Sequence, residues 1–342
     1  MQRDSLAARL VAADRGSRRY RPQHPLPLAG SAGADLGGAL DGLRKVMDQV
    51  SGIILGKETQ IQLTLACLLA RGHLLIEDLP GVGKTTLAHA LANSLGLRFQ
   101  RIQFTSDLLP ADIIGVSIFD RQAGSFKFHP GPIFAPMILA DEVNRATPKA
   151  QSALLEAMEE HQVTTEGETH ELPEPFFVIA TQNPSYQVGT FPLPESQLDR
   201  FLMCLRLGYP NARAERSLLE GRDRRDMMAE LKRCVTAEEL TALQQSVRAV
   251  FASPALYDYL QAIISYTRQS PELVTGLSPR AGLNLLHAAR AWALLEGRSH
   301  VLPEDLQAVL PSVVGHRLQA PGQQGRDSVE IARRLLAEVA IP

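Results

Sequence analysis

Cysteine and aromatic residues are scarce in this chain of 342 residues, which has three cysteines, one tryptophan and 5% aromatic residues overall. Cys67, Cys204 and Cys234 lie far apart and form no CxxC pair, which excludes a disulfide framework and predicts reduced thiols. The nine histidines lack metal-binding spacing as well, since His170-Glu171 begins an HExxH pattern that no second histidine completes. Neither residue type predicts a metal site.

Charge of one sign and long apolar runs are also missing. The 35 lysines and arginines nearly balance 37 aspartates and glutamates, so general attraction to nucleic acid or anionic lipid is not expected. The best apolar stretch, 63–75, is interrupted by Arg71 and His73, whereas a membrane span needs about 18 apolar residues. The N-terminus has neither the apolar core nor the cleavage site of a signal peptide. We therefore expect a cytoplasmic protein with no membrane span.

What the chain does contain is typical of a globular protein, with 45% hydrophobic and 21% charged residues. Its length corresponds to about two domains. Residues 1–30 differ from the rest, because they carry six arginines against two aspartates and are followed by proline- and glycine-rich sequence. We interpret residues 1–35 as a flexible basic extension, with a docking arm or a targeting segment as the alternative.

Strand and helix patterns alternate between residues 36 and 208. Short apolar runs separated by helical spacing predict an α/β fold, with a five-stranded parallel sheet between helices. The expected strands are 73–77, 98–105, 137–140, 175–181 and 202–207. The expected helices are 36–50, 58–71, 85–95 and one that starts at Thr147-Pro148.

Strand patterns mostly stop after Tyr209-Pro210. Residues 209–342 are therefore expected to form a second, all-helical domain. Its expected helices are 212–229, 237–251, 254–268, 279–296, 303–309 and 328–339.

The strongest motif is EDLPGVGKTT at residues 77–86, which follows the first expected strand and opens a helix. Gly81 and Gly83 allow a turn whose N–H groups point inward at phosphate oxygens. Lys84 adds a positive charge, and Thr85 offers a hydroxyl to Mg²⁺. The motif predicts a nucleoside triphosphate site. The residues expected to bind the nucleotide are Pro80, Gly81, Val82, Gly83, Lys84, Thr85 and Thr86.

One position of this loop departs from the general pattern GxxxxGK[ST], because Asp78 stands where the first glycine is usual. Aspartate tolerates left-handed backbone better than most residues do. We therefore expect the loop to form in spite of the substitution.

Two further apolar runs end in polar side chains. MILADE at 137–142 ends in Asp141, which can hold Mg²⁺, and Glu142, which can accept a proton from an attacking water. FFVIATQN at 176–183 ends in Asn183, whose amide could orient that water, although asparagine before proline also suits a turn. Together with the glycine-rich loop, these ends predict a site for hydrolysis of a bound triphosphate.

The three elements, in this order, resemble the AAA+ ATPases, and longer strings resemble the MoxR family in particular. These strings are DEVNRA at 141–146, QSALLEAMEE at 151–160, ATQNP at 180–184, PESQLDRF at 194–201 and LSPRA at 277–281. The resemblance covers about residues 38–320. It implies a P-loop AAA+ core at 36–208, a C-terminal all-α lid domain at 209–342, and ATP and Mg²⁺ as cofactors.

The resemblance also implies roles for single residues, in a ring, usually a hexamer, whose nucleotides lie between subunits. Arg200 resembles the arginine finger that reaches into the neighbour's site, and Arg280 resembles the sensor 2 arginine that touches the γ-phosphate within its own subunit. Asn183 resembles sensor 1, and Ile54 and Gly56 belong to a segment whose backbone contacts adenine. Without the resemblance, a surface ion pair would be the simpler interpretation of both arginines.

Two stretches, 116–129 and 162–172, alternate in polarity around a glycine and are expected to form hairpin insertions. In related AAA+ proteins such hairpins face the central pore or the partner, which makes Phe126 and Phe128 candidates for substrate contact. The simpler interpretation is two solvent-exposed hairpins.

We expect a Mg²⁺-dependent, MoxR-type ATPase that remodels or matures protein complexes as a ring, with a protein client and a partner containing a von Willebrand factor A domain. The alternatives are a magnesium-chelatase-like metal-insertion subunit, a nucleic-acid motor and a nucleotide switch that hardly turns over. The motor is disfavoured, because the hairpin at 162–172 carries Glu166, Glu168 and Glu171 and no lysine or arginine.

Overall fold

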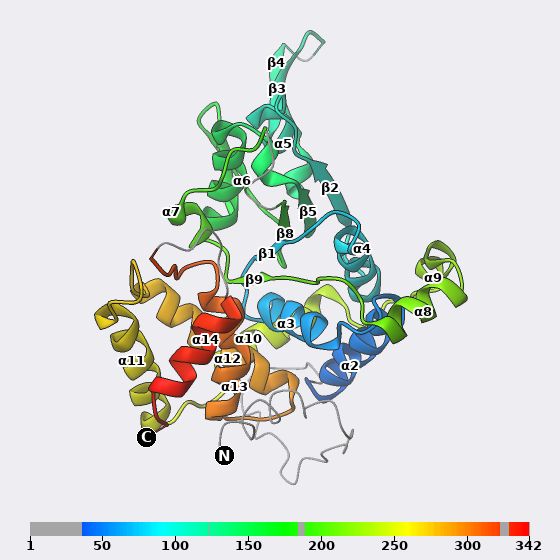
Figure 1. Ribbon diagram of the computed structural model, residues 1–342. Coiled ribbons are helices and arrows are strands. Elements are labelled where there is room, and N and C mark those ends of the chain that lie inside the picture. The colour runs from blue at the N-terminus through cyan, green and yellow to red at the C-terminus, as the bar shows by residue number, and fades with distance from the viewer. Residues whose placement is uncertain (1–35, 123, 184–188, 322–327, 342) are drawn as a thin grey trace.

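The computed structural model describes residues 36–122, 124–183, 189–321 and 328–341 (Figure 1). The predicted extension 1–35 lies outside the described residues. Within the described ranges, no helix combines the length and the apolar character that crossing a bilayer requires.

The predicted five-stranded parallel sheet is confirmed, with the strand order β2-β5-β8-β1-β9. Its strands are β1 (Leu74–Glu77), β2 (Phe99–Gln103), β5 (Met137–Asp141), β8 (Phe177–Gln182) and β9 (Met203–Leu205). Every residue of β5 and β8 is buried, as expected for central strands covered on both faces. The strands β1, β5 and β8 are parallel neighbours, so their carboxyl ends meet at one edge of the sheet.

Successive residues of the strands point to opposite faces and enter two apolar clusters. On β5, Met137 and Leu139 belong to one cluster, and Ile138 and Ala140 belong to the other. The helices of the sheet region are α2 (Leu36–Ile53), α3 (Glu58–Leu69), α4 (Lys84–Leu95), α5 (Pro110–Ile114), α6 (Pro148–Glu160) and α7 (Glu195–Leu198). Short 3₁₀ turns lie at Pro132–Phe134 and Val143–Arg145.

Helix α6 begins where the sequence predicts. The Thr147 side chain accepts a hydrogen bond from the Ala150 N–H, and Pro148 occupies the first turn, where its missing N–H is not needed. Ala150, Leu154 and other apolar residues of this helix are buried against one face of the sheet. The cap fixes where α6 begins, and the apolar residues fix which side of the helix packs against the sheet.

Both predicted hairpins form. Strands β3 (Gly115–Asp120) and β4 (Ser125–Pro130) pair antiparallel and project from the body of the molecule (Figure 1). Strands β6 (Gln162–Thr165) and β7 (Glu168–Glu171) pair likewise and turn at two left-handed residues, Glu166 and Gly167. The two hairpins meet where the Phe128 ring stacks on His170, with centroids 4.0 Å apart. Phe126 is 67% exposed, whereas Phe128 is held in this stack.

The region after residue 209 is helical, as predicted. Its helices are α8 (Ala212–Glu220), α9 (Arg224–Ala229), α10 (Ala237–Val247), α11 (Pro254–Gln269), α12 (Pro279–Leu295), α13 (Pro303–Val314) and α14 (Ser328–Glu338). The prediction of one helix over 212–229 is wrong, because Gly221 adopts extended backbone and Asp223 caps a new helix at the Arg225 N–H. Helices α8 and α9 lie beside α2 (Figure 1), where Arg224 donates to the Gly52 carbonyl.

Helix α13 runs past the predicted end at residue 309 and contains Pro311. A proline inside a helix costs about 3 kcal/mol. Burying a Leu or Val side chain contributes about 1.5–3 kcal/mol, and Leu310, Val313 and Val314 are all fully buried. Packing therefore outweighs the local signal on which the sequence prediction rested.

The described part of the helical lid packs on the sheet region. A single apolar cluster contains buried residues of α2, α3 and α4, one face of the sheet, and α10 to α14. Helix α3 packs against α12, and Gln244 on α10 donates to the Leu68 carbonyl over 2.7 Å. The lid that the sequence predicts after residue 209 therefore shares an apolar core with the sheet region.

One glycine is required by close packing beside the sheet. A Cβ on Gly72, just before β1, would lie 2.3 Å from the Leu202 side chain. Gly72→Ala is therefore expected to lower the free energy of unfolding by about 1–3 kcal/mol through overpacking, measured by urea denaturation. The control is Gly52→Ala in helix α2, where an added Cβ meets nothing within 4 Å. This substitution is expected to raise the free energy of unfolding by about 0.5–1 kcal/mol, because alanine favours a helix more than glycine does. Equal effects of the two substitutions would contradict the packing argument.

Candidate active site

The phosphate-binding motif forms the predicted strand–loop–helix unit, with β1 ending at Glu77 and α4 beginning at Lys84. Gly81 and Gly83 have φ values of 85° and 95°, the left-handed conformation that only glycine adopts without strain. The Lys84 ammonium is buried and donates to the Asp78 carbonyl oxygen over 2.6 Å. The loop thus holds its lysine against its own backbone.

Burial lowers the pKa of Lys84, and the carboxylates of Asp78, Asp141 and Glu142 oppose that shift. The strand preceding the loop, β1, lies beside β8, and β8 lies beside β5, so the loop and the acidic pair follow the carboxyl ends of strands in one part of the sheet. Lysine suits the binding of phosphate oxygens, and carboxylates suit a divalent cation, whose charge offsets part of the charge of a triphosphate.

Asp78 does not adopt the left-handed conformation that the pattern GxxxxGK[ST] led us to consider. Its buried carboxylate instead accepts hydrogen bonds from the Leu79 N–H at 2.8 Å and the Gly208 N–H at 2.6 Å. Gly208 lies between β9 and α8. Asp78 therefore ties the phosphate loop to the segment that leads into the lid.

The predicted adenine segment lies beside this loop. A Cβ on Gly83 would be 3.8 Å from the Ile54 side chain, and one on Gly56 would be 3.3 Å from Ala214 on α8. Gly56 has a φ of 70°, so the chain turns sharply there. Residues 54–56 thus sit between the phosphate loop and the first lid helix, and their contact with adenine stays a prediction.

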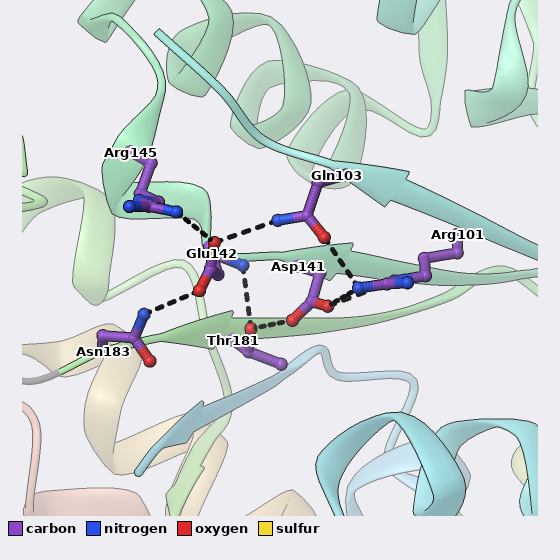
Figure 2. A network of polar contacts seen from close by, with 7 residues as sticks. All are labelled: Arg101, Gln103, Asp141, Glu142, Arg145, Thr181 and Asn183. Atoms are coloured by element: carbon purple, nitrogen blue, oxygen red, sulfur yellow. Dashed lines mark hydrogen bonds and ion pairs between the residues drawn. The ribbon is translucent and has the colours of Figure 1, made fainter. Parts of the chain in front are cut away.

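Asp141 is the last residue of β5, and its two carboxylate oxygens have different partners (Figure 2). Oδ1 accepts from the Thr181 hydroxyl at 2.6 Å, and Oδ2 accepts from the Arg101 guanidinium at 2.5 Å. The Thr181 hydroxyl also accepts from the Glu142 N–H at 2.9 Å. One hydroxyl on β8 therefore orients both members of the acidic pair.

Glu142 follows with left-handed backbone, at a φ of 57°. Its Oε1 accepts from the Asn183 amide at 2.9 Å, and its Oε2 accepts from Gln103 at 3.1 Å and Arg145 at 3.0 Å (Figure 2). The sequence places Asn183 opposite Glu142 across a water, whereas the structure brings the two side chains into direct contact. The carboxylate is held by three donors from three segments of the chain.

Sequence reasoning missed the residues that hold the acidic pair, namely Arg101 and Gln103 on β2 and Thr181 on β8. Arg101 and Gln103 lie two residues apart on one strand, so they face the same side. That alternation was visible in the sequence. It became informative only through the pairing of β2 with β5, which sets Gln103 opposite Asp141.

The residues predicted to hold Mg²⁺ fit that ion chemically. Thr85 is exposed at the start of α4 and offers a hydroxyl, and Asp141 offers carboxylate oxygens. Hard oxygen donors of this kind, completed by phosphate oxygens and water, are what Mg²⁺ prefers. Arg101 shares Oδ2 of Asp141, so its guanidinium lies beside the position that a cation would take.

Arg200 and Arg280 lie together, and both pair with Glu159 near the end of α6. The Arg200 Nε–Glu159 Oε2 distance is 3.0 Å, and Arg280 Nη2 lies 2.5 Å from Glu159 Oε1. The adjacent Met158 carbonyl contacts His73, immediately before β1, so this cluster lies at the amino edge of the sheet. We predicted that Arg280 touches the γ-phosphate of its own subunit, but the structure places it with Arg200, at the edge opposite the phosphate loop.

Comparison with known proteins agrees with this architecture. Residues 73–203 match the ATPase family associated with various cellular activities (AAA), and residues 265–335 match the AAA lid domain. The chain is 44% identical to YeaC of Bacillus subtilis, with 88% of this chain and 95% of that protein covered. It is 38% identical to Chaperone MoxR1 of Mycobacterium tuberculosis, with 96% of this chain and 89% of that protein covered.

A solved structure of a protein from Cytophaga hutchinsonii superposes with a TM-score of 0.82 at 35% identity, covering 90% of this chain and 97% of that chain. The chain thus resembles these proteins over most of its length, and both of its regions match AAA family models. This chain belongs to the MoxR family of AAA+ ATPases.

Proposed function

We propose that this ATPase is Mg²⁺-dependent and works as a ring that remodels or matures protein complexes. The observation that carries the catalytic part is the convergence of Lys84, Asp141 and Glu142 at one edge of the sheet. Lys84 and the loop N–H groups bind the phosphates. Thr85 and Asp141 would hold Mg²⁺, which would neutralise part of the charge on the phosphate oxygens.

Glu142 is the proposed general base. It accepts the proton of the water that attacks the γ-phosphorus, and ADP leaves as the bond to the bridging oxygen breaks. Asn183 and Gln103 hold the two oxygens of Glu142 before the reaction, over 2.9 Å and 3.1 Å. A base oriented in this way need not reorganise when water and nucleotide arrive, which favours the reaction.

The position of the two arginines supports action between subunits. Arg200 and Arg280 share one carboxylate, Glu159, which leaves a local surplus of positive charge at the amino edge of the sheet. Their side chains are 30% and 50% exposed, so an anionic group can reach them. We propose that both bind the nucleotide of the next subunit, in a head-to-tail contact that closes a ring, expected to be a hexamer.

The proposed client and partner are proteins, including one with a von Willebrand factor A domain. Hairpin β3–β4 exposes Ile118, Phe119 and Phe126, and the two phenylalanine rings pack edge to face at 5.3 Å. Exposed aromatic residues suit contact with protein, whereas a nucleic-acid site would need clustered basic residues. We keep the cytoplasm as the proposed location, because the free cysteines suit a reducing compartment.

Steady-state phosphate release tests the proposal. The purified chain is expected to hydrolyse ATP with Mg²⁺, to lose that activity in EDTA, and to show no stimulation by DNA at physiological salt. Analytical ultracentrifugation with a non-hydrolysable ATP analogue is expected to show a closed oligomer. Activity that persists in EDTA would contradict Mg²⁺ dependence, and a monomer with full activity would contradict the ring.

A further inference from the structure

Arg317, in the lid just after α13, is among the most enclosed charged side chains described, with 5% of it exposed. A guanidinium has five N–H donors, and burial without acceptors is unfavourable for each of them. All five donors of Arg317 have partners within 3.1 Å. This side chain is therefore fully bonded in one orientation.

Four of these five bonds go to one short segment, residues 199–202, which we call the finger turn. The Arg317 Nε donates to the Asp199 carboxylate at 2.6 Å. The two terminal nitrogens donate to the backbone carbonyls of Asp199 at 3.0 Å, Phe201 at 2.6 Å and Leu202 at 3.1 Å. The remaining bond goes to Val313 of α13. Arg317 thus fastens the finger turn to the end of a lid helix.

Two neighbouring contacts act on the same turn from the lid. The buried His316 ring contacts the Phe201 carbonyl at 2.9 Å, and the Ser278 hydroxyl, which caps α12, lies 3.3 Å from the Asp199 carboxylate. Phe201 itself is fully buried. Arg200 is the residue of the turn whose side chain reaches outward, to Glu159.

We propose that Arg317 is a positioning residue that holds the finger turn, so that the lid of one subunit sets where its Arg200 enters the active site of the next. The inference rests on the proposed function, because it takes Arg200 as the arginine finger. Arg317 touches neither nucleotide nor Mg²⁺ in this proposal. It acts through three backbone carbonyls and one carboxylate of the finger turn.

A lysine cannot replace this residue. Its ammonium is a single centre with three donors, whereas the bonds of Arg317 reach carbonyls spread over residues 199–202 and 313. Arg317→Lys therefore keeps the buried charge beside Asp199 and loses part of the clamp. A displacement of about 1 Å at a catalytic group can lower a rate by about a hundredfold.

The test uses the full chain with Arg317→Lys and measures nucleotide affinity by fluorescence and ATP turnover by phosphate release. Nucleotide affinity is expected to stay within about twofold, and turnover to fall by about tenfold to a hundredfold. The matched control is Arg298→Lys, a second lid arginine that pairs with Asp305 in the first turn of α13. It is expected to leave turnover per folded molecule within about twofold.

Mixed rings separate positioning from a general structural role. Arg317→Lys subunits are combined with Glu142→Gln subunits, which have an inactive site of their own but an intact finger and clamp. Turnover is expected to return, because the defect of Arg317→Lys lies in the neighbour's site. If Arg317→Lys shows no cooperative thermal unfolding, the same test is made with Asp199→Asn. Asparagine has the size of aspartate but lacks the charge that attracts the Arg317 guanidinium.

Three results would contradict this inference, and the third would also contradict the proposed role of Arg200. A folded Arg317→Lys protein with wild-type turnover shows that the clamp does not matter for catalysis. A loss that mixing fails to restore, while Arg200→Ala is restored, shows that Arg317 supports only its own subunit. If mixing does not restore the turnover of Arg200→Ala either, Arg200 does not act between subunits, and the premise of this inference is wrong.

Discussion

Glu142→Gln is expected to leave ATP binding intact and to lower the rate of hydrolysis by about 10²–10⁴-fold, the usual contribution of a general base. Glutamine has the same shape and can still accept from Asn183, but it cannot take a proton from water at neutral pH. Fluorescent-nucleotide titration measures the first quantity, and steady-state phosphate release measures the second.

The control for this substitution is Glu156→Gln, the same exchange at an exposed position of α6. It is expected to hydrolyse ATP at the wild-type rate. If Glu142→Gln does so too, another group takes the proton and the role of Glu142 is wrong. A loss of nucleotide binding in Glu142→Gln would instead show that this carboxylate is needed for nucleotide binding rather than only for proton transfer.

Arg200→Ala is expected to lower turnover by about 10³-fold, at the lower end of what an arginine finger contributes. Nucleotide affinity of the same chain should change little, because Arg200 lies with Arg280 and Glu159 at the sheet edge opposite its own phosphate loop. Mixing with Glu142→Gln subunits should restore part of the activity, since each inactive subunit still brings an intact Arg200 to its neighbour.

Arg216→Ala is the matched control, because Arg216 forms an exposed ion pair with Glu220 on α8, and surface pairs contribute little. It should behave as wild type in both assays. Partial recovery in the mixed Arg200→Ala ring places the finger between subunits. No recovery at any mixing ratio would assign Arg200 to its own subunit or to the ion pair with Glu159 alone.

The two predictions probe opposite edges of one sheet, and the lid connects these edges. Asp78 bonds the phosphate loop to Gly208 at the start of the lid segment, and Arg317 bonds the finger turn to the end of α13. A ligand-dependent shift of the lid would therefore move both segments. Loss of the γ-phosphate is the event that would bias such a shift.

Several features of this protein follow from its sequence, because their causes are local. Gly81 and Gly83 adopt left-handed backbone where the phosphate motif requires it, and Glu166-Gly167 turns a hairpin in the same way. Thr147 and Pro148 start α6 through their own capping chemistry. Polar residues at the ends of apolar strands indicate Asp141, Glu142 and Asn183, since parallel strands bring their carboxyl ends to one edge.

Other features required the tertiary structure, because their causes lie between segments that are distant in sequence. The sequence of a single strand does not predict the order of the strands in the sheet. That order brings Arg101, Gln103 and Thr181 to the acidic pair. Helix α13 continues past Pro311 because its apolar residues pack in the core.

The same reason applies to the lid. The motif around Arg200 cannot say where helix α12, far along the chain, will dock, and only docking places Arg280 beside Arg200, at Glu159. Docking also brings Arg317, an ordinary arginine in the sequence, to the finger turn, which it contacts through four of its five hydrogen bonds. Local chemistry thus determined which residues are candidates for a nucleotide site, and long-range packing decided which of them meet.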